Sequence, residues 1–155
     1  MNSGLADLYQ EVILDHSKHP RNFGPAPDAN RQARGNNPLC GDRVTVYLKL
    51  DGDRIEDAKF EARGCAISVA SASMMTEMIK GKTVDEARSL FDRFHALVTG
   101  EDGDAADAAT ADEEMAELAS LSGVRAFPTR IKCATLAWHA MTAALEGSGE
   151  EVKTE

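Results

Sequence analysis

Hydrophobic and polar residues alternate with a period of two between residues 44 and 50, in the order Val-Thr-Val-Tyr-Leu-Lys-Leu. This period puts the apolar side chains on one face of a strand, and the Asp51-Gly52 pair that follows is typical of a two-residue hairpin turn. The return strand is therefore expected over about 54–63. In that strand Ile55 and Phe60 lie in opposite phases, which indicates a bulge or a start outside the sheet.

Apolar residues recur at intervals of three and four elsewhere, and this spacing predicts helices. The predicted helices cover about 4–17, 68–80, 84–99 and 129–146, with a shorter helix over 112–120. A capping box, Thr83 followed by Glu86, opens the third of them. The segment 22–37 is rich in Gly, Pro and Asn and is interpreted as a loop without a regular element. Because the strands come early and the helices follow in a run, the order is that of an α+β fold, with a small antiparallel β-sheet packed against several helices.

The chain has 155 residues, of which 43% are hydrophobic, and this is enough for a single domain over 1–155 with its own core. No run of 18 apolar residues occurs, so a membrane-spanning helix is not expected. The first residues lack the basic and apolar pattern of a signal sequence. Three cysteines, an odd number without such a signal, argue against a disulfide framework and favour a reducing, cytoplasmic location.

The formal net charge of −9 is concentrated in one segment. Residues 101–117 hold eight acidic residues and no Lys or Arg, so they supply −8 of that total. We interpret about 100–122 as an acidic insertion, either a solubilising loop or a surface that recognises a partner. The tail from about residue 147 is expected to be flexible. The charge argues against nucleic acid as a partner, since phosphate binding needs a clustered basic face.

The three cysteines all fall at or near the ends of predicted elements. Cys40 precedes the first strand, Cys65 follows the strand-breaking Gly64, and Cys133 lies in the first turns of the last helix. Such positions can meet at one end of a sheet, where thiolates bind zinc or iron–sulfur units and the carboxylate of Asp42 completes a set of four. Alternatively, the cysteines are core residues, because free cysteine is often buried and behaves as a small hydrophobic residue. Spacing alone leaves both interpretations open, because no Cys-x-x-Cys pair is present.

Other residues that carry chemistry have simpler interpretations. Arg130 lies one helical turn before Cys133 and is either a contact for a partner or a solvated arginine. His16 and His19 are close enough to bind metal, but the proline after them favours a capping or packing role. A structural role is also favoured for two further histidines and a methionine cluster: His95, His139, Met74, Met75 and Met78.

Four segments of the chain resemble, in order, the NifU/IscU/SufU family of iron–sulfur cluster assembly proteins. They are DHSKHPRNFG at 15–24, GNNPLCGDRV at 35–44, DAKFEARGCAISVASASMM at 57–75 and RIKCATLAW at 130–138. Three of the segments contain a cysteine, and together they extend over nearly the whole chain. The resemblance implies an IscU/NifU-like α+β domain with one metal site, whose ligands are Cys40, Asp42, Cys65 and Cys133.

Within this family the chain is more similar to the SufU-like branch than to scaffolds of the IscU type. Lys132 stands where those scaffolds carry a histidine directly before the third cysteine. They also lack the insertion at about 100–122. Residues 127–130, Phe-Pro-Thr-Arg, replace the Pro-Val-Lys pattern that a chaperone recognises in scaffolds.

The SufU-like resemblance implies a zinc-bound protein that accepts persulfide sulfur from a SufS-type cysteine desulfurase and passes it to a downstream iron–sulfur scaffold. Whether this makes the chain an enzyme, a zinc-dependent sulfurtransferase, stays open. Cys40 is the expected acceptor because its loop is the ligand segment most able to move, with Cys65 and Cys133 as anchors. Two alternatives remain: a scaffold that assembles an iron–sulfur cluster on the same ligands, and a purely structural zinc domain.

Overall fold

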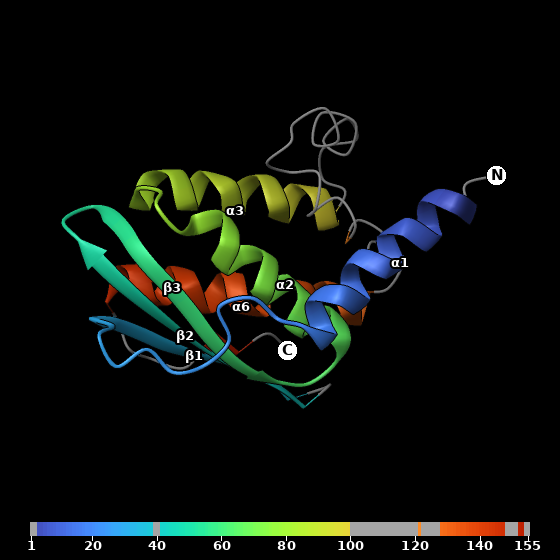
Figure 1. Cartoon of the computed structure of the whole chain (residues 1–155), viewed down its shortest axis with the longest axis horizontal. Coiled ribbons are helices and arrows are strands. Elements are labelled where there is room, and N and C mark those ends of the chain that lie inside the picture. Colours follow the sequence, from blue (N-terminus) through green and yellow to red (C-terminus); the bar gives the residue numbers. More distant parts are fainter. Residues whose placement is uncertain (1–2, 39–40, 100–120, 122–127, 148–151, 154–155) are drawn as a thin grey trace.

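The computed structural model of the chain describes residues 3–38, 41–99, 121, 128–147 and 152–153. Figure 1 shows the helices gathered on one side of a twisted sheet. The elements in chain order are α1 (Ser3–Lys18), β1 (Arg31–Asn37), β2 (Asp42–Asp51), β3 (Arg54–Arg63), α2 (Ala66–Ile79), α3 (Val84–Thr99), α6 (Pro128–Glu146) and β4 (Val152–Lys153). The predicted α+β class is confirmed.

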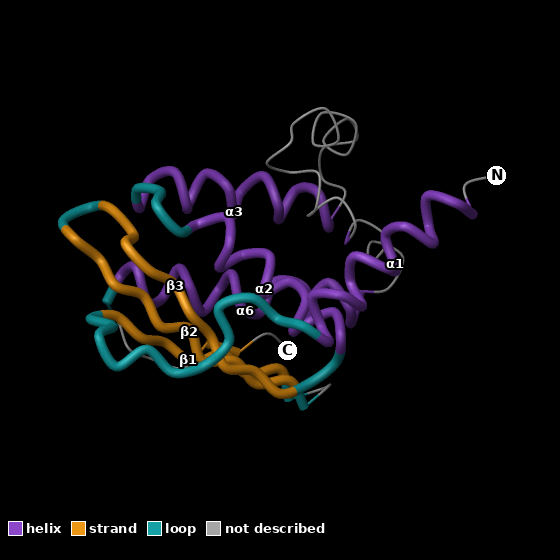
Figure 2. The backbone as a smooth tube through the Cα atoms, in the orientation of Figure 1, coloured by secondary structure: helices purple, strands orange, loops and turns teal. Residues whose placement is uncertain are grey.

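The sheet has the strand order β3-β2-β1-β4, with antiparallel pairing except for the short β4, which runs parallel to β1. Helix α6 packs on β1 and β2, while α2 packs on β3. In β2, residues 42, 44, 46 and 48 are buried and the residues between them are partly or fully exposed. One face of the sheet is therefore covered by helices, and the other is open, as the tube in Figure 2 also shows.

The hairpin between β2 and β3 agrees with the alternating pattern except at its turn. Asp51 pairs with Arg54, so the two turn residues are Gly52 and Asp53 instead of the predicted Asp51 and Gly52. Gly52 has φ +62°, which suits glycine at the first position of such a turn. The register shifts between Lys49 and Leu50, which confirms the predicted bulge in this hairpin.

The prediction of a loop throughout 22–37 is wrong, because Arg31–Asn37 forms strand β1. Its sequence RQARGNN has low strand propensity and a single apolar side chain, so the pairing with β2 overrides the local preference. Gly35 is needed for close packing here. A β-carbon at that position would lie 2.9 Å from Cδ1 of Leu136 on α6.

The helices form the other half of the core. The capping box is confirmed: the Thr83 amide donates to Glu86 Oε1 at 3.0 Å, and the Glu86 amide donates to Thr83 Oγ1 at 3.2 Å. Trp138 of α6 stacks on Phe94 of α3 with 4.8 Å between ring centroids. Met74 and Met75 of α2 are fully buried, so they belong to the core as predicted. None of the helices in the described ranges is long and apolar enough to cross a membrane.

The C-terminal part of the described chain contains the end of α6 and one further short strand, while most of the tail predicted from about residue 147 lies outside the described residues. Helix α6 ends at Glu146, where Gly147 has φ +73° and donates its amide to the Ala144 carbonyl at 3.0 Å. Val152–Lys153 then pairs with β1. The acidic insertion at about 100–122 and the short helix predicted over 112–120 lie, except for the buried Leu121, outside the described residues.

Candidate metal centre

Three of the four predicted ligands come together from three different elements. Asp42 is the first residue of β2 and belongs to the helix-facing set of that strand. Cys65 is the N-cap of α2, and Cys133 lies in the second turn of α6. One ligand atom from each residue lies within 4.8 Å of the other two. The sheet end, one helix start and one helix side thus converge as the sequence predicted for Asp42, Cys65 and Cys133.

The Asp42 carboxylate is fully buried and fixed by the start of α2. Its Oδ1 accepts a hydrogen bond from the Cys65 amide at 2.9 Å, and its Oδ2 lies 3.8 Å from Cys65 Sγ. Between the end of β3 and the N-cap Cys65 lies Gly64, with φ +147°. A β-carbon there would overlap Asp42 Oδ1 and lie 2.8 Å from Cγ. Glycine is therefore required both for the backbone conformation and for the carboxylate.

Cys133 is buried in the same part of the fold and has a polar neighbour that sequence reasoning did not select. The side-chain amide of Asn37 donates to Cys133 Sγ at 3.7 Å, and Asn37 is itself completely buried. Asn37 pairs with Asp42 across β1 and β2, so the two polar side chains enter the site from adjacent strand ends. Recognition of 31–37 as a strand would have placed Asn37 on the helix-facing side.

Cys40 itself lies outside the described residues, but both ends of its loop are described. The Gly41 amide donates to the Asn37 carbonyl at 2.9 Å, and Gly41 has φ +74°. This hydrogen bond holds Gly41, just before β2, next to the end of β1. The loop that contains Cys40 therefore starts at one residue of the site, Asn37, and ends beside another, Asp42.

Arg130 is exposed at the rim of the cluster. The negative charges of the Cys65 thiolate and then the Cys133 thiolate raise the pKa of its guanidinium, with hydrogen bonds to both sulfurs adding to the effect. A cation next to cysteine favours the thiolate form, which is the form that binds a metal.

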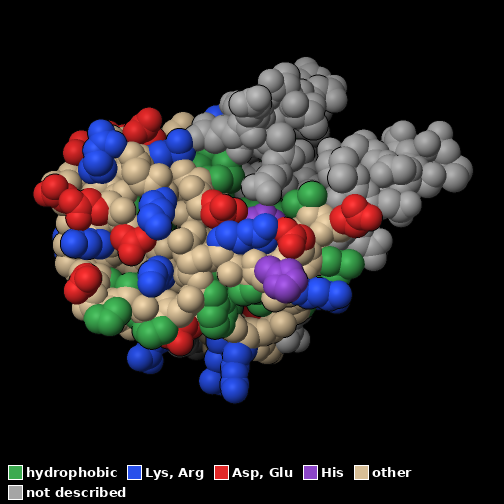
Figure 3. All heavy atoms as spheres, in the orientation of Figure 1, with side chains coloured by type: hydrophobic (Ala, Val, Ile, Leu, Met, Phe, Trp, Pro, Cys, Tyr) green, Lys and Arg blue, Asp and Glu red, His purple; other side chains and the backbone are tan. Residues whose placement is uncertain are grey.

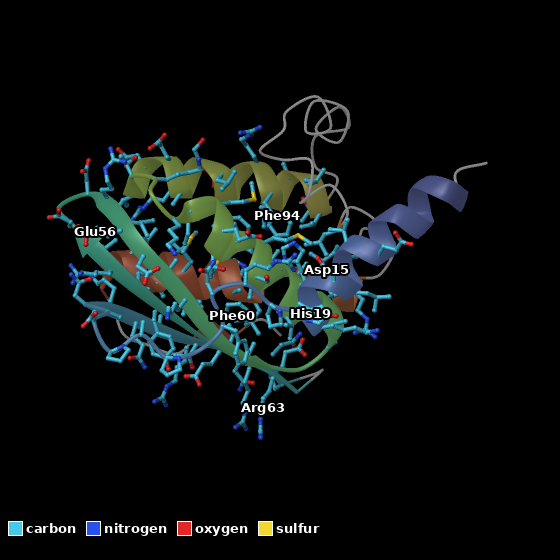
Figure 4. The ribbon with its side chains drawn as sticks, in the orientation of Figure 1. Asp15, His19, Glu56, Phe60, Arg63 and Phe94 are labelled. Atoms are coloured by element: carbon cyan, nitrogen blue, oxygen red, sulfur yellow. The ribbon has the colours of Figure 1, made fainter. Side chains whose placement is uncertain are left out.

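The histidines lie apart from the thiolates. His16 is buried and its Nδ1 is 2.8 Å from Ser73 Oγ, which is a packing role that ties α1 to α2. His19 is exposed at the end of α1, near Asp15, as Figure 4 shows. His139 packs edge-on against Phe91 with 5.1 Å between ring centroids. Burial first and the charge of His95 second lower the pKa of His139.

The donor set suits zinc. Two thiolates and one carboxylate are ordinary zinc ligands, and Zn–S and Zn–O bonds of about 2.3 and 2.1 Å put two tetrahedral ligands about 3.6 Å apart. The 3.8 Å between Cys65 Sγ and Asp42 Oδ2 is close to that separation. A tetrahedral zinc site takes four ligands, so these three residues would leave one position for a further ligand.

Known proteins resemble this chain over almost its whole length. The family of the NifU-like N terminal domain matches residues 8–134. The zinc-dependent sulfurtransferase SufU of Bacillus subtilis (strain 168) is 47% identical over 140 residues, which cover 90% of each chain. The iron–sulfur cluster assembly scaffold protein IscU of Streptococcus pyogenes serotype M1 is 43% identical over 146 residues, 94% of this chain and 87% of that protein.

Solved structures agree with the fold. A protein from the thermophile Fervidobacterium islandicum AW-1, proposed as an iron–sulfur cluster assembly scaffold for the SUF system, has a TM-score of 0.78 and 36% identity. The match covers 92% of this chain and 98% of that protein's chain. The N-terminal part of a NifU-like protein from Brucella abortus has a TM-score of 0.79 and 25% identity. The match covers 94% of this chain and 96% of that chain. By sequence and by fold, then, this chain belongs to the family of the NifU-like N-terminal domain.

Proposed function

We propose that the chain takes part in iron–sulfur cluster assembly by zinc-dependent sulfur transfer. The observation that carries the proposal is the convergence of the ligand atoms of Asp42, Cys65 and Cys133 within 4.8 Å. The similarity to the sulfurtransferase SufU of Bacillus subtilis supports the choice of zinc. Cys40, Asp42, Cys65 and Cys133 would hold the ion. Zinc, when bound, undergoes no redox change and keeps ligand thiols deprotonated.

The sulfur acceptor in this proposal is Cys40. Its thiolate attacks the outer sulfur of a persulfide on the donor protein, so that one S–S bond forms as another breaks. The donor cysteine leaves as a thiolate and Cys40 becomes the persulfide, which leaves charge and electrons balanced without an added oxidant. Cys65 and Cys133 are held by a helix start and a helix side. Cys40 falls in the connection between β1 and β2, and connecting segments are more easily displaced than helices.

The donor in this proposal is a SufS-type cysteine desulfurase and the recipient is a downstream iron–sulfur scaffold, both in the cytoplasm. Arg130 supports the first assignment as a partner contact, because its exposed guanidinium lies next to both described thiolates. A persulfide that approaches these sulfurs is anionic near neutral pH, so a cation at the rim favours its approach. Residues 1–155 would act as one domain that carries 100–122 as an insertion.

The test is incubation of the zinc-loaded protein with desulfurase and cysteine, followed by intact-mass measurement. We expect a gain of one sulfur atom in the wild type, and its loss in Cys40→Ser. Cys40→Ser should keep its folded far-ultraviolet spectrum. If the protein held zinc but gained no sulfur, a structural zinc domain would replace sulfur transfer as the proposed function.

A second function has specific support, since relatives such as the IscU of Streptococcus pyogenes are described as assembly scaffolds. In that case the same four residues would hold an iron–sulfur cluster as cargo. The absorbance and metal content of the protein purified from its native host, without added metal, distinguish the scaffold function from sulfur transfer. An absorbing iron–sulfur chromophore as the main isolated form would favour the scaffold, and colourless protein with one zinc per chain would favour sulfur transfer.

A further inference from the structure

Two arginines stand directly opposite each other on the open face of the sheet, at the end that carries the metal centre. Arg43 of β2 and Arg63 of β3 are register partners, and both are exposed. Arg43 follows the ligand Asp42, and Arg63 comes two residues before the ligand Cys65. Figure 4 shows Arg63 reaching away from the ribbon at this end, and Lys and Arg side chains project from the same edge in Figure 3.

This arginine pair is not neutralised within the described part of the chain. Neither guanidinium makes an ion pair there, whereas other cations do, such as Lys49 with Glu56 at 3.5 Å. The nearby acid on this face, Glu61, accepts a hydrogen bond from the Tyr47 hydroxyl at 2.5 Å. Like charges directly across two strands cost stability. An anion brought by another molecule would relieve that repulsion.

The pair separates two hollows of the surface. One, of about 340 Å³, is lined by Phe23, Thr45 and Glu61 together with both arginines. The other, of about 530 Å³, is lined by both arginines with Asn36, Pro38 and Gly41, the last two of which flank the loop of Cys40. A molecule seated on the arginines thus contacts an aromatic hollow on one side and the Cys40 loop on the other.

Phe23 gives the surface an apolar contact. It is 49% exposed, which is the larger value of the two exposed large hydrophobic side chains in the described ranges, Phe23 and Leu14. Its ring packs edge-on against the buried Phe60 with 5.3 Å between centroids, so it is held in place. Aromatic residues and arginine are enriched among the residues that contribute most of the binding energy in protein interfaces, and this surface has both.

We propose that Arg43, Arg63 and Phe23 form a docking surface for an acidic segment of the desulfurase that delivers sulfur to the Cys40 loop. This inference rests on the proposed function, because it assigns the donor to this face. Two unneutralised guanidinium groups select carboxylates, and the aromatic hollow accepts an apolar side chain next to them. The contact would orient the donor cysteine toward the hollow that borders Pro38 and Gly41.

The test is charge reversal at Arg63, measured as direct binding of the metal-loaded protein to the desulfurase without cysteine. Arg63→Glu should weaken binding about tenfold at low salt. It should also retain the wild-type zinc content and unfold no more easily, because the introduced carboxylate would face Arg43 and replace a repulsion by an attraction. Added salt should weaken wild-type binding more than that of the variant.

The matched control is Lys49→Glu, which makes the same change of charge on β2, roughly 20 Å from Arg43 along the strand. It should bind the desulfurase within about twofold of the wild type, as expected for a charge outside the interface. Equal affinities of wild type and Arg63→Glu would overturn the docking surface while leaving sulfur transfer intact. Tight desulfurase binding that requires Arg63, without any sulfur gain, would support the surface and refute the transfer function. Equal weakening by both variants would point to nonspecific attraction and would also overturn it.

Discussion

Gly64 and Asp42 occupy the same small space at the end of the sheet. The Asp42 carboxylate fills the position where a β-carbon of residue 64 would stand, and it accepts the amide hydrogen bond of Cys65 there. The glycine before the second cysteine is therefore part of the candidate metal centre. Because glycine has no β-carbon, the buried carboxylate of Asp42 and the start of α2 can approach each other closely.

Substitution Gly64→Ala should damage the centre and the fold together. The new methyl group forces the Asp42 carboxylate aside, and φ +147° is strained for alanine. We expect a loss of at least about 2 kcal/mol in the free energy of unfolding. Zinc affinity, measured by competition with a chromophoric chelator, should fall by about tenfold or more.

Gly24→Ala separates strain from contact. Gly24 has φ +130°, but a β-carbon there would meet nothing within 4 Å. This variant should lose stability from strain alone and keep the zinc affinity of the wild type. If Gly64→Ala bound zinc as tightly as Gly24→Ala, the carboxylate would not depend on the glycine.

Asn37 should tune the metal centre from outside the ligand set. Its buried amide donates to Cys133 Sγ, and a hydrogen bond to a thiolate stabilises the charged form that binds metal. Asn37→Ala should lower zinc affinity by about tenfold, measured by chelator competition. The neighbour Asn36 belongs to the other face of β1, where it lines the surface hollow. Asn36→Ala should leave zinc affinity unchanged, and an equal loss in both variants would assign the effect to β1 in general.

Most elements follow from the sequence because their signals are local, whereas the site follows from the family resemblance of the cysteine motifs. Alternation predicted the hairpin, and the Thr83 and Glu86 pair predicted the start of α3 through two hydrogen bonds that the structure contains. The motifs around each cysteine predicted the convergence of Asp42, Cys65 and Cys133. Spacing alone did not, because residues 42 and 133 meet only through the packing of α6 on the sheet.

Strand β1 escaped prediction because its stability comes from elsewhere. Its Gly35 and Asn37 are poor strand formers, yet the first admits Leu136 and the second reaches Cys133. A residue chosen for what it touches across the fold carries little signal in its own neighbourhood. For the same reason β4, two residues long and paired only to β1, could not be foreseen.

Metal removal should loosen the whole core, since the proposed ligands Asp42, Cys65 and Cys133 belong to β2, the N-cap of α2 and α6. A ligand that binds only the folded state stabilises it by about 4 kcal/mol when present at a thousand times its dissociation constant. A chelator should therefore lower the thermal unfolding midpoint, and added zinc should restore it. Cys133→Ser should show a low midpoint that responds to neither addition. A chelator effect that persisted in Cys133→Ser would place the stabilising metal elsewhere.

Two serines on α2 should respond in opposite ways to the same substitution. Ser71 Oγ donates to the Ala134 carbonyl at 2.5 Å and accepts from Trp138 Nε1 at 3.0 Å, all in the core. Ser71→Ala leaves the buried indole N–H without a partner and should cost about 1–3 kcal/mol in urea unfolding.

Ser68 is the matched control on the same helix. Its hydroxyl is buried, and it makes no hydrogen bond among the described residues. Ser68→Ala should leave stability unchanged or raise it, because an unsatisfied buried hydroxyl is removed. Equal losses in the two variants would show that helix α2 needs serine for a reason other than the Trp138 bond.

His139 should make the protein less stable in weak acid. Burial and the neighbouring His95 lower its pKa from the usual 6.5, so the folded state binds a proton there less readily than the unfolded state does. Above pH 6.5 the ring is neutral in both states and has no effect. As the pH falls below 6.5, the unfolded state gains the proton first, and stability declines until the folded-state pKa is passed.

His139→Gln should reduce the difference between urea midpoints at about pH 7.5 and about pH 5.5. His19→Gln, which removes an exposed histidine, should keep the wild-type difference. A pH response unchanged by His139→Gln would assign the acid sensitivity to other groups.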